Sequence, residues 1–307
     1  RHGVPLRARL VAELPRLARV ASLAPALANL RNRVPVLRRL SARMGLAESR
    51  SLPEWSAAPF RDAEAAGTPA PRGDVLLLAD TFNRYFEPEN LRAAVRVLAA
   101  AGFRAVLPAS AGRPLCCGRT YLAAGMVARA RQEAARTLAA LAGDLPVVGL
   151  EPSCLLTLRD EFASLLPGPA TAALAGRAML LSEFLVRQGV QLDMVTIGAR
   201  AHVHGHCHQK AFGAFPDALA VLRGVPGLEV TPIKSSCCGM AGAFGYQSET
   251  QDASRAMAEA GLLPAVRAAA MEDWIVADGT SCRHQIADLS GRRAVHSVQL
   301  LDRALRQ

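Results

Sequence analysis

The sequence predicts an α/β fold made of two duplicated subdomains, each with a mostly parallel sheet, behind a basic helical segment at the N-terminus. From residue 74 onward, short apolar runs typical of buried strands alternate with helical stretches, an order typical of parallel α/β structure. This order occurs twice, and cysteines fall at matching places in the two copies. With 307 residues and 51% hydrophobic content, the chain can bury a substantial core.

Residues 1–50 form a basic lead-in that we interpret as a docking segment. Leucines recur there at helical spacing, and prolines divide the segment into short helices. The leucines are Leu6, Leu10, Leu14 and Leu17, and the prolines are Pro5, Pro15, Pro25 and Pro35. Eleven arginines against two acids give this segment +9 of the net charge of +10, so the remainder of the chain is nearly neutral. Because no aromatic-studded basic face accompanies the charge, nucleic-acid binding is not expected.

The start of the chain and the segment that follows the lead-in also carry information. An Arg-rich, acid-poor start can mark an organelle transit peptide, but the recurrent prolines argue against one. The sequence begins with Arg1 rather than Met, which suggests a piece of a longer chain. Residues 51–73 are rich in Pro, Ala and Gly and predict an extended linker. We expect a cytoplasmic protein with at most peripheral contact at the inner membrane face, because no uninterrupted apolar run of about 18 residues is present.

The first subdomain is expected over residues 74–200 and the second over residues 201–307. Each contains three strand candidates separated by helical stretches. In the first these strands are Val75–Ala79, Ala105–Leu107 and Val147–Leu150, with helices at 90–101 and 119–141. In the second they are Ala201–His204, Leu228–Thr231 and Trp274–Ala277, with helices at 216–223, 248–260 and 264–271.

Six of the seven cysteines repeat between the subdomains. The first carries LCCGRTYLAAG at 115–125 and EPSC at 151–154, and the second carries SCCGMAGAFG at 236–245 and GTSC at 279–282. The seventh, Cys207, follows the first strand of the second subdomain in HGHCHQK, where the first subdomain has Phe82. Cysteines at the carboxyl ends of parallel strands can converge on one polynuclear centre, next to helix N-termini that favour thiolates.

The second subdomain therefore predicts the principal metal site, because four cysteines are the usual ligand set of a cubane iron–sulfur cluster. These ligands are Cys207, Cys237, Cys238 and Cys282, and a weaker, degenerate site would use Cys116, Cys117 and Cys154. We expect Gly239, and Gly118 at the matching place, to let the backbone pass close to the metal centre. Four histidines, His202, His204, His206 and His208, alternate along a strand-like run and would share one face. Among them His208, and then His206, are the candidates for tuning the centre by hydrogen bonding.

Other interpretations of the cysteines remain open at this point. Zinc suits four cysteines or three cysteines with a histidine, and His206 and His208 flank Cys207. Structural disulfides fit poorly, because the spacings do not suggest a stapled small scaffold. Buried free cysteines acting as core residues would not explain two Cys-Cys-Gly elements at matching places.

These motifs resemble the tandem cysteine-rich CCG domains found in three groups of proteins: the B component of heterodisulfide reductase, the glycolate oxidase iron–sulfur subunit and the anaerobic glycerol-3-phosphate dehydrogenase electron-transfer subunit. The family pattern is a Cys, an interval of thirty to forty residues, Cys-Cys-Gly, a similar interval, and Cys-x-x-Cys. Here 29 residues separate Cys207 from Cys237 and 43 separate Cys238 from Cys282. The chain departs from the pattern at Gly279, Phe82 and Glu151.

A closer resemblance is to the carboxyl end of fused FAD-binding and iron–sulfur-binding D-2-hydroxy-acid dehydrogenases. It implies an electron-transfer module that relays electrons from flavin to an acceptor such as a quinone or cytochrome. The cofactors would be a 4Fe-4S cluster, cubane or non-cubane, and FAD in an upstream part that also has a ferredoxin-like segment. The substrate would be D-lactate, glycolate or D-2-hydroxyglutarate. The alternatives are an interaction scaffold with zinc or no metal, and a disulfide-reducing site like that of heterodisulfide reductase.

Overall fold

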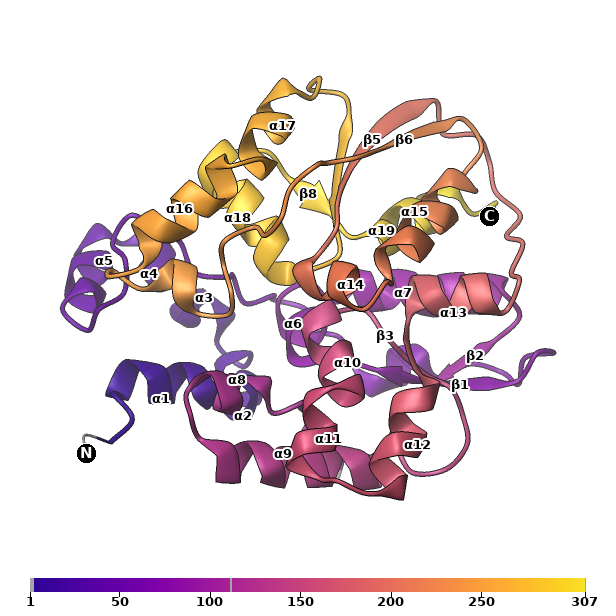
Figure 1. The fold of residues 1–307 in the computed structure, drawn as a ribbon, viewed down its shortest axis with the longest axis horizontal. Coiled ribbons are helices and arrows are strands. Elements are labelled where there is room, and N and C mark those ends of the chain that lie inside the picture. Colours follow the sequence, from indigo (N-terminus) through magenta and orange to yellow (C-terminus); the bar gives the residue numbers. More distant parts are fainter. Residues whose placement is uncertain (1–2, 111, 307) are drawn as a thin grey trace.

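A computed structural model describes residues 3–110 and 112–306 and contains two four-stranded sheets in which every strand is parallel to its neighbours (Figure 1). The strand orders are β2-β1-β3-β4 and β6-β5-β7-β8, so the same topology occurs twice. The strands are β1 (Asp74–Leu78), β2 (Arg104–Val106), β3 (Val147–Gly149), β4 (Ala178–Leu180), β5 (Ala199–His204), β6 (Leu228–Pro232), β7 (Trp274–Ala277) and β8 (Ala294–Val295). The predicted class, two duplicated parallel α/β units behind a helical segment, is confirmed.

Each sheet has one strand more than the sequence predicts. The additional strands, β4 and β8, are the last of their sheets and contain three and two residues. A run this short carries no periodicity, and its pairing with β3 or β7 decides its conformation.

Helices connect the strands of both halves. In the first half they are α6 (Thr81–Tyr85), α7 (Pro88–Ala100), α8 (Arg119–Ala123), α9 (Val127–Ala140), α10 (Pro152–Arg159), α11 (Glu161–Leu165), α12 (Pro169–Arg177) and α13 (Leu181–Arg187). In the second half they are α14 (Cys207–Ala211), α15 (Phe215–Arg223), the 3-10 turn η2 (Phe244–Tyr246), α16 (Gln251–Glu259), α17 (Leu262–Ala268), α18 (Thr280–Ser290) and α19 (Ser297–Ala304). The stretch 119–141, expected as one helix, is divided into α8 and α9 because Gly125 has a φ of +72°.

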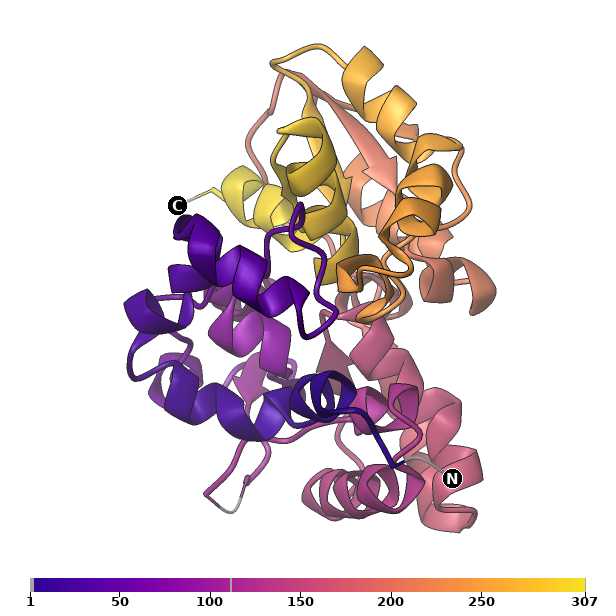
Figure 2. The ribbon, with the colours of Figure 1, turned by 90° about the vertical axis from the view of Figure 1, so that its left-hand side faces the viewer.

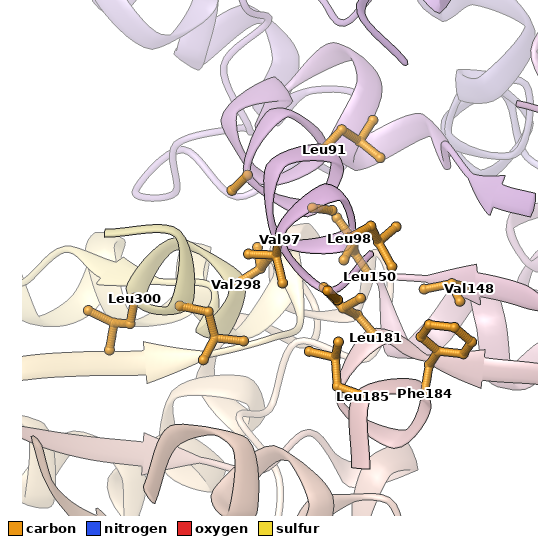
Figure 3. Packing of buried hydrophobic residues seen from close by; sticks show 14 of the residues in the cluster. Leu91, Val97, Leu98, Val148, Leu150, Leu181, Phe184, Leu185, Val298 and Leu300 are labelled. Carbon is orange, nitrogen blue, oxygen red and sulfur yellow. The ribbon is translucent and has the colours of Figure 1, made fainter. Parts of the chain in front are cut away.

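The two sheets share a helical layer. Alternate residues of β1 face opposite sides, so Val75 and Leu77 join an inner core that contains residues of both halves, whereas Leu76 and Leu78 join an outer core of the first half. In Figure 3, Val97 and Leu98 of α7 lie beside Val298 of α19 within this inner core. The halves are therefore packed into one hydrophobic unit.

The lead-in folds into five short helices along one side of both halves (Figure 2). They are α1 (Leu6–Ala12), α2 (Leu14–Ala21), α3 (Pro25–Ala28), α4 (Leu30–Arg33) and α5 (Pro35–Ala42). The four prolines lie at or just before the first turns of helices, where the absent N–H costs nothing. Residues 51–73 contain one 3-10 turn, η1 (Asp62–Ala65), and hydrogen-bond to Tyr85 and Arg84 through Ser56 and Phe60.

A membrane-spanning helix needs about 20 predominantly apolar residues. Among residues 3–110 and 112–306, no helix is both long and apolar enough to cross a bilayer.

Candidate metal centre

The four cysteines of the second half gather at the carboxyl edge of its sheet. Cys207 opens α14 after β5, Cys237 and Cys238 follow β6, and Cys282 lies in the first turn of α18 after β7. Their thiols lie close enough to shift one another's pKa values, Cys237 with Cys207 and Cys238, and Cys238 with Cys282. Parallel strands that end at one edge bring together side chains up to 75 residues apart in the sequence. All seven cysteines of the chain lie in its described part and are free thiols.

Interactions among the four thiols lower the pKa of Cys237 and Cys282 and raise the pKa of Cys207 and Cys238. Hydrogen bonds from Cys207 and Cys238 lower the pKa of Cys237 to about 2, and the backbone N–H of Gly239 lies 3.3 Å from its Sγ. Lys210 is held near the thiols by hydrogen bonds to the carbonyls of Ser235 and Ser236. Burial lowers the pKa of the Lys210 ammonium, and the four thiols oppose that shift. Lys210 follows Cys207 by three residues in the HGHCHQK motif, a signal that the predicted site leaves out.

His204 joins the cysteine group, which the sequence does not predict. A nitrogen of its ring and the sulfurs of Cys238 and Cys282 all lie within 4.8 Å of one another. The residue is 1% exposed and ends β5. Its Nδ1 lies 2.8 Å from the hydroxyl of Ser235, and its Nε2 is buried with no hydrogen-bond partner among the described residues.

The expectation that four alternating histidines share a strand face is wrong. The strand ends at His204, and after Gly205 the His206 side chain accepts a hydrogen bond from the His208 N–H and caps α14. His202, on the strand, pairs with Asp273 at 2.9 Å. His206 Nδ1 lies 3.9 Å from Cys207 Sγ, close enough to affect the thiol.

His208 contacts a residue of the first half. Its Nε2 lies 3.0 Å from the guanidinium of Arg119, which follows the first Cys-Cys-Gly element. Burial, with the Arg119 charge second, lowers the pKa of His208 to about 4, so the ring is neutral near pH 7. Of the two predicted tuning histidines, His206 is the one with a contact to a thiol.

The glycines of the two Cys-Cys-Gly elements have the same conformation. Gly118 and Gly239 have φ values of +81° and +86°, which favour glycine. A Cβ on Gly118 would lie 2.9 Å from the carbonyl oxygen of Ala130, and one on Gly239 would lie 2.3 Å from that of Ser254. Glycine is therefore required here by the close approach to the following helix, α9 or α16, and the expected closeness to a metal centre stays a prediction.

The first half brings together three thiols. Cys117 contacts both Cys116 and Cys154, and all three are buried. The hydrogen bond with Cys117 and burial raise the pKa of Cys154, and the carboxyls of Asp80 and Glu151 raise it further. Burial, with Glu151 second, raises the pKa of Asp80 to about 7. Acidic side chains thus lie beside Cys154 here, whereas the Lys210 ammonium lies beside the cysteines of the second half.

The residue of the first half that corresponds to Cys207 is one position earlier than the sequence predicts. Asp80 and His206 are both N-caps whose side chains accept from the N–H two residues later, so α6 matches α14 from its first residue. Thr81, rather than Phe82, therefore stands opposite Cys207. The strand and turn before α6 differ in sequence from those before α14, so the register becomes visible only in the structure.

Polar contacts join the two cysteine groups across the halves. The Glu151 carboxylate accepts from the N–H of Ser153 at 3.2 Å and from the N–H of Thr280 at 2.8 Å, so one side chain caps both α10 and α18. His206 Nε2 lies 3.3 Å from the Ser153 hydroxyl, beside Cys154. The carboxyl edges of the two sheets thus face each other.

The donor set of the second half fits a metal centre. Four thiols with mutual contacts, two of them buried to 4% and 1% exposure, and an unpartnered imidazole nitrogen form a soft, sulfur-rich set among the described residues. Thiolate ligands suit iron–sulfur clusters and zinc. The three thiols of the first half form a poorer set.

Comparisons with known proteins find relatives of this chain. The chain is 28% identical over 277 residues to the C subunit of the anaerobic glycerol-3-phosphate dehydrogenase of Escherichia coli, a match that covers 87% of this chain and 68% of the relative. It is 29% identical over 248 residues to D-2-hydroxyglutarate dehydrogenase of Pseudomonas putida, covering 76% of this chain but 23% of that protein. It is 32% identical over 138 residues to lactate utilization protein A of Bacillus velezensis, covering 42% of this chain and 58% of the relative.

The family match covers more than half of the chain. The CCG cysteine-rich domain matches residues 81–159 and again residues 201–287, which places one copy on each of the two sheets. Each match includes the Cys-Cys-Gly element and the last cysteine of its half. The chain therefore belongs to the CCG cysteine-rich domain family and carries two copies of that domain.

Proposed function

We propose that this chain is the iron–sulfur electron-transfer module of an FAD-dependent D-2-hydroxy-acid dehydrogenase. The observation that carries the proposal is the convergence of Cys207, Cys237, Cys238 and Cys282 at one sheet edge. The names of the similar proteins support it, since they are a dehydrogenase subunit, a D-2-hydroxyglutarate dehydrogenase and a lactate utilization protein. The substrate class follows from those names and not from the site.

In this proposal the second half holds the principal centre, a 4Fe-4S cluster of cubane or non-cubane form. When bound, such a cluster accepts and donates single electrons. The four cysteines hold it, Gly239 directs a backbone N–H at Cys237, and Lys210 offsets the negative charge of the thiolates. Hydrogen bonds to ligand sulfurs and nearby positive charge raise the reduction potential of a cluster.

The first half would hold a weaker centre or none. Cys116, Cys117 and Cys154 supply three thiols, and Asp80 and Glu151 add negative charge beside Cys154. The fourth thiol is replaced by Thr81, which is a poor iron ligand. This asymmetry disfavours a disulfide-reducing site that would need two equivalent centres.

Partners follow from the proposed role. An electron relay requires a donor, for which we propose an FAD-containing domain or subunit with a ferredoxin-like segment, and an acceptor such as a quinone or cytochrome. We place the relay in the cytoplasm, with contact at the inner membrane face where such an acceptor resides.

Zinc is the second candidate, because a set of cysteines with His204 also suits tetrahedral zinc. Anaerobic purification followed by iron, acid-labile sulfide and zinc analysis separates the two. The proposal expects iron and sulfide in similar amounts with visible absorbance. Zinc without sulfide would support a metal-stabilised scaffold and overturn the electron-transfer role.

A further inference from the structure

We propose that the Nε2 atom of His204 is a metal ligand of the second half, completing a set with Cys207, Cys237, Cys238 and Cys282. The inference rests on the proposed function for the identity of the metal. The position of the imidazole among the thiols is independent of that function.

Side chains alternate between the two faces of β5, and His204 lies on the face nearest the cysteine group. Ala201 and Val203 join the inner core shared with the first half, so His204 lies on the opposite face of the strand. That face belongs to the outer core of the second half, which contains Cys238 and Cys282. His204 is also the last residue of β5, at the edge where the helices of Cys207 and Cys282 begin.

The two nitrogens of the ring have different surroundings. Nδ1 lies 2.8 Å from the Ser235 hydroxyl, whereas Nε2 is buried with no nitrogen or oxygen partner among the described residues. The groups nearest to the ring on that side are thiols, and Cys238, with the imidazole after it, lowers the pKa of the Cys282 thiol. Donation from Nδ1–H to Ser235 would fix the tautomer that leaves a lone pair on Nε2, which is the arrangement of a metal-bound histidine and its outer partner.

No side chain at position 279 can supply a fifth ligand. Gly279 precedes Cys282 by three residues and carries no side chain, and a Cβ there would lie 2.5 Å from Cδ2 of His206. The His206 ring therefore occupies this space, and its Nδ1 is used to cap α14. Among the described residues, His204 has a ring nitrogen within 4.8 Å of two of these thiols, those of Cys238 and Cys282.

The first half has no equivalent of this imidazole at the matching, described position. The pairing of β1 with β3 and of β5 with β7 places Leu78 opposite Gly149 and His204 opposite Ala277, so Leu78 stands where His204 does. A leucine offers no donor atom. The imidazole is thus confined to the half with four thiols, as expected for a ligand of the principal centre.

The test uses the whole chain, purified anaerobically in wild-type form and with His204→Ala, His204→Cys and, as a control, His202→Ala. His202 lies on the same strand and face, but its ring pairs with Asp273. Iron and sulfide are measured first, and iron loss to a chelator is then followed in each variant. Reduced samples labelled with 15N-histidine are examined by pulsed electron paramagnetic resonance for coupling between the centre and a ring nitrogen.

We expect a directly bonded nitrogen coupling in the wild type and in His202→Ala, and its loss in His204→Ala. The chelator should remove iron faster from His204→Ala than from the wild type. The corresponding loss of metal affinity should exceed the roughly 10–100-fold loss seen when an outer-shell partner is removed. His204→Cys should retain iron without the nitrogen signal. Full iron content without nitrogen coupling in the wild type would overturn the ligand and leave the proposed function intact. Absence of iron and sulfide would overturn the proposed function, and zinc-edge absorption spectroscopy would then show whether His204 binds zinc.

Discussion

Cys237 is the central thiol of the second cysteine group, because it contacts Cys207 on one side and Cys238 on the other. We predict that Cys237→Ser loses most of the bound iron and visible absorbance, since a serine hydroxyl is a poor substitute for a thiolate. The measurement is iron and sulfide content after anaerobic purification. Cys116→Ser, at the matching place in the first half, is the control and should keep most of the iron. Equal loss from both variants would contradict a single principal centre.

Substitution of Gly239 tests whether close packing against α16 holds the loop that carries Cys237 and Cys238 in place. Gly239→Ala introduces a Cβ 2.3 Å from the Ser254 carbonyl at a φ of +86°, whereas Gly242→Ala is a control at a φ of +67° with open space. Both changes incur the strain of positive φ, and overpacking costs a further 1–3 kcal/mol or so at Gly239 alone. Denaturant unfolding of the two variants should show this difference. Equal stability would mean that α16 moves aside freely.

For single residues, the sequence predicts which side chains can bind a metal better than it predicts which of them lie together. The four cysteines could be predicted as one group because their spacing and strand ends are visible in the sequence. His204 could not be separated from His202, His206 and His208, because the end of the strand at Gly205 depends on a helix cap that forms only in the fold. The HGHC motif nevertheless holds a usable signal, since a glycine between histidines favours a break in the strand.

Among the structural elements, α18 and the start of α7 are joined by a buried ion pair. Arg283 of α18 is 4% exposed and binds the carboxylate of Glu87, which also accepts from the Thr280 hydroxyl at 2.8 Å. Burial would raise the pKa of Glu87, but Arg283 and these hydrogen bonds lower it overall. Removal of one partner of such a pair typically costs about 3–5 kcal/mol. The pair therefore helps to hold the two halves together.

This pair predicts a pH dependence. Because the pKa of Glu87 is lowered in the folded protein, its contribution is present above the unfolded pKa of about 4.3 and is lost as the pH falls through the folded value. Wild-type stability should thus fall more steeply below about pH 4.5 than that of Glu87→Gln, which is already destabilised at pH 7. Denaturant unfolding across this range is the measurement. Asp193→Asn, which breaks an exposed pair with Arg306, should leave the profile unchanged. Parallel profiles for wild type and Glu87→Gln would contradict the assignment.

The longer elements were predictable and the shortest were not. All six predicted strands form, with ends that differ by at most two residues, because buried apolar runs determine them. Strands β4 and β8 are not predicted because two or three residues carry no pattern. The order of the strands and the sharing of α7, α13, α15 and α19 between the sheets depend on contacts far apart in the sequence.

Over the whole molecule, the lead-in packs onto the body as well as presenting a basic surface. Arg50 is 1% exposed and pairs with Asp288 of α18 at 3.1 Å, and its guanidinium also contacts Met240 just after the second Cys-Cys-Gly element. Near its start, Glu13 accepts from the Tyr121 hydroxyl of α8 at 2.7 Å. The segment therefore contacts both cysteine-bearing halves. Its docking to a separate partner stays a prediction, supported by exposed apolar residues such as Leu23 and Leu27.

The proposed relay predicts how the whole chain behaves without a flavin partner. Oxidation of a hydroxy acid releases two electrons as a hydride, which a flavin can accept, whereas the cysteine groups described above suit single electrons. The isolated 307 residues should therefore not oxidise D-lactate or D-2-hydroxyglutarate with an artificial acceptor. A chemical reductant should nevertheless bleach the visible absorbance of the same sample, which would demonstrate that the centre is intact and redox-active.

The matched assay adds the flavin-containing part, either joined to this chain or mixed with it. Substrate should then bleach the absorbance of the wild-type chain, and the Cys237→Ser variant should interrupt electron delivery to the natural acceptor while flavin reduction by substrate persists. Loss at that step alone is expected because, in this proposal, Cys237 holds the relay and does not touch the substrate. Turnover by the isolated chain, or full delivery to the natural acceptor without an intact Cys237, would refute the relay.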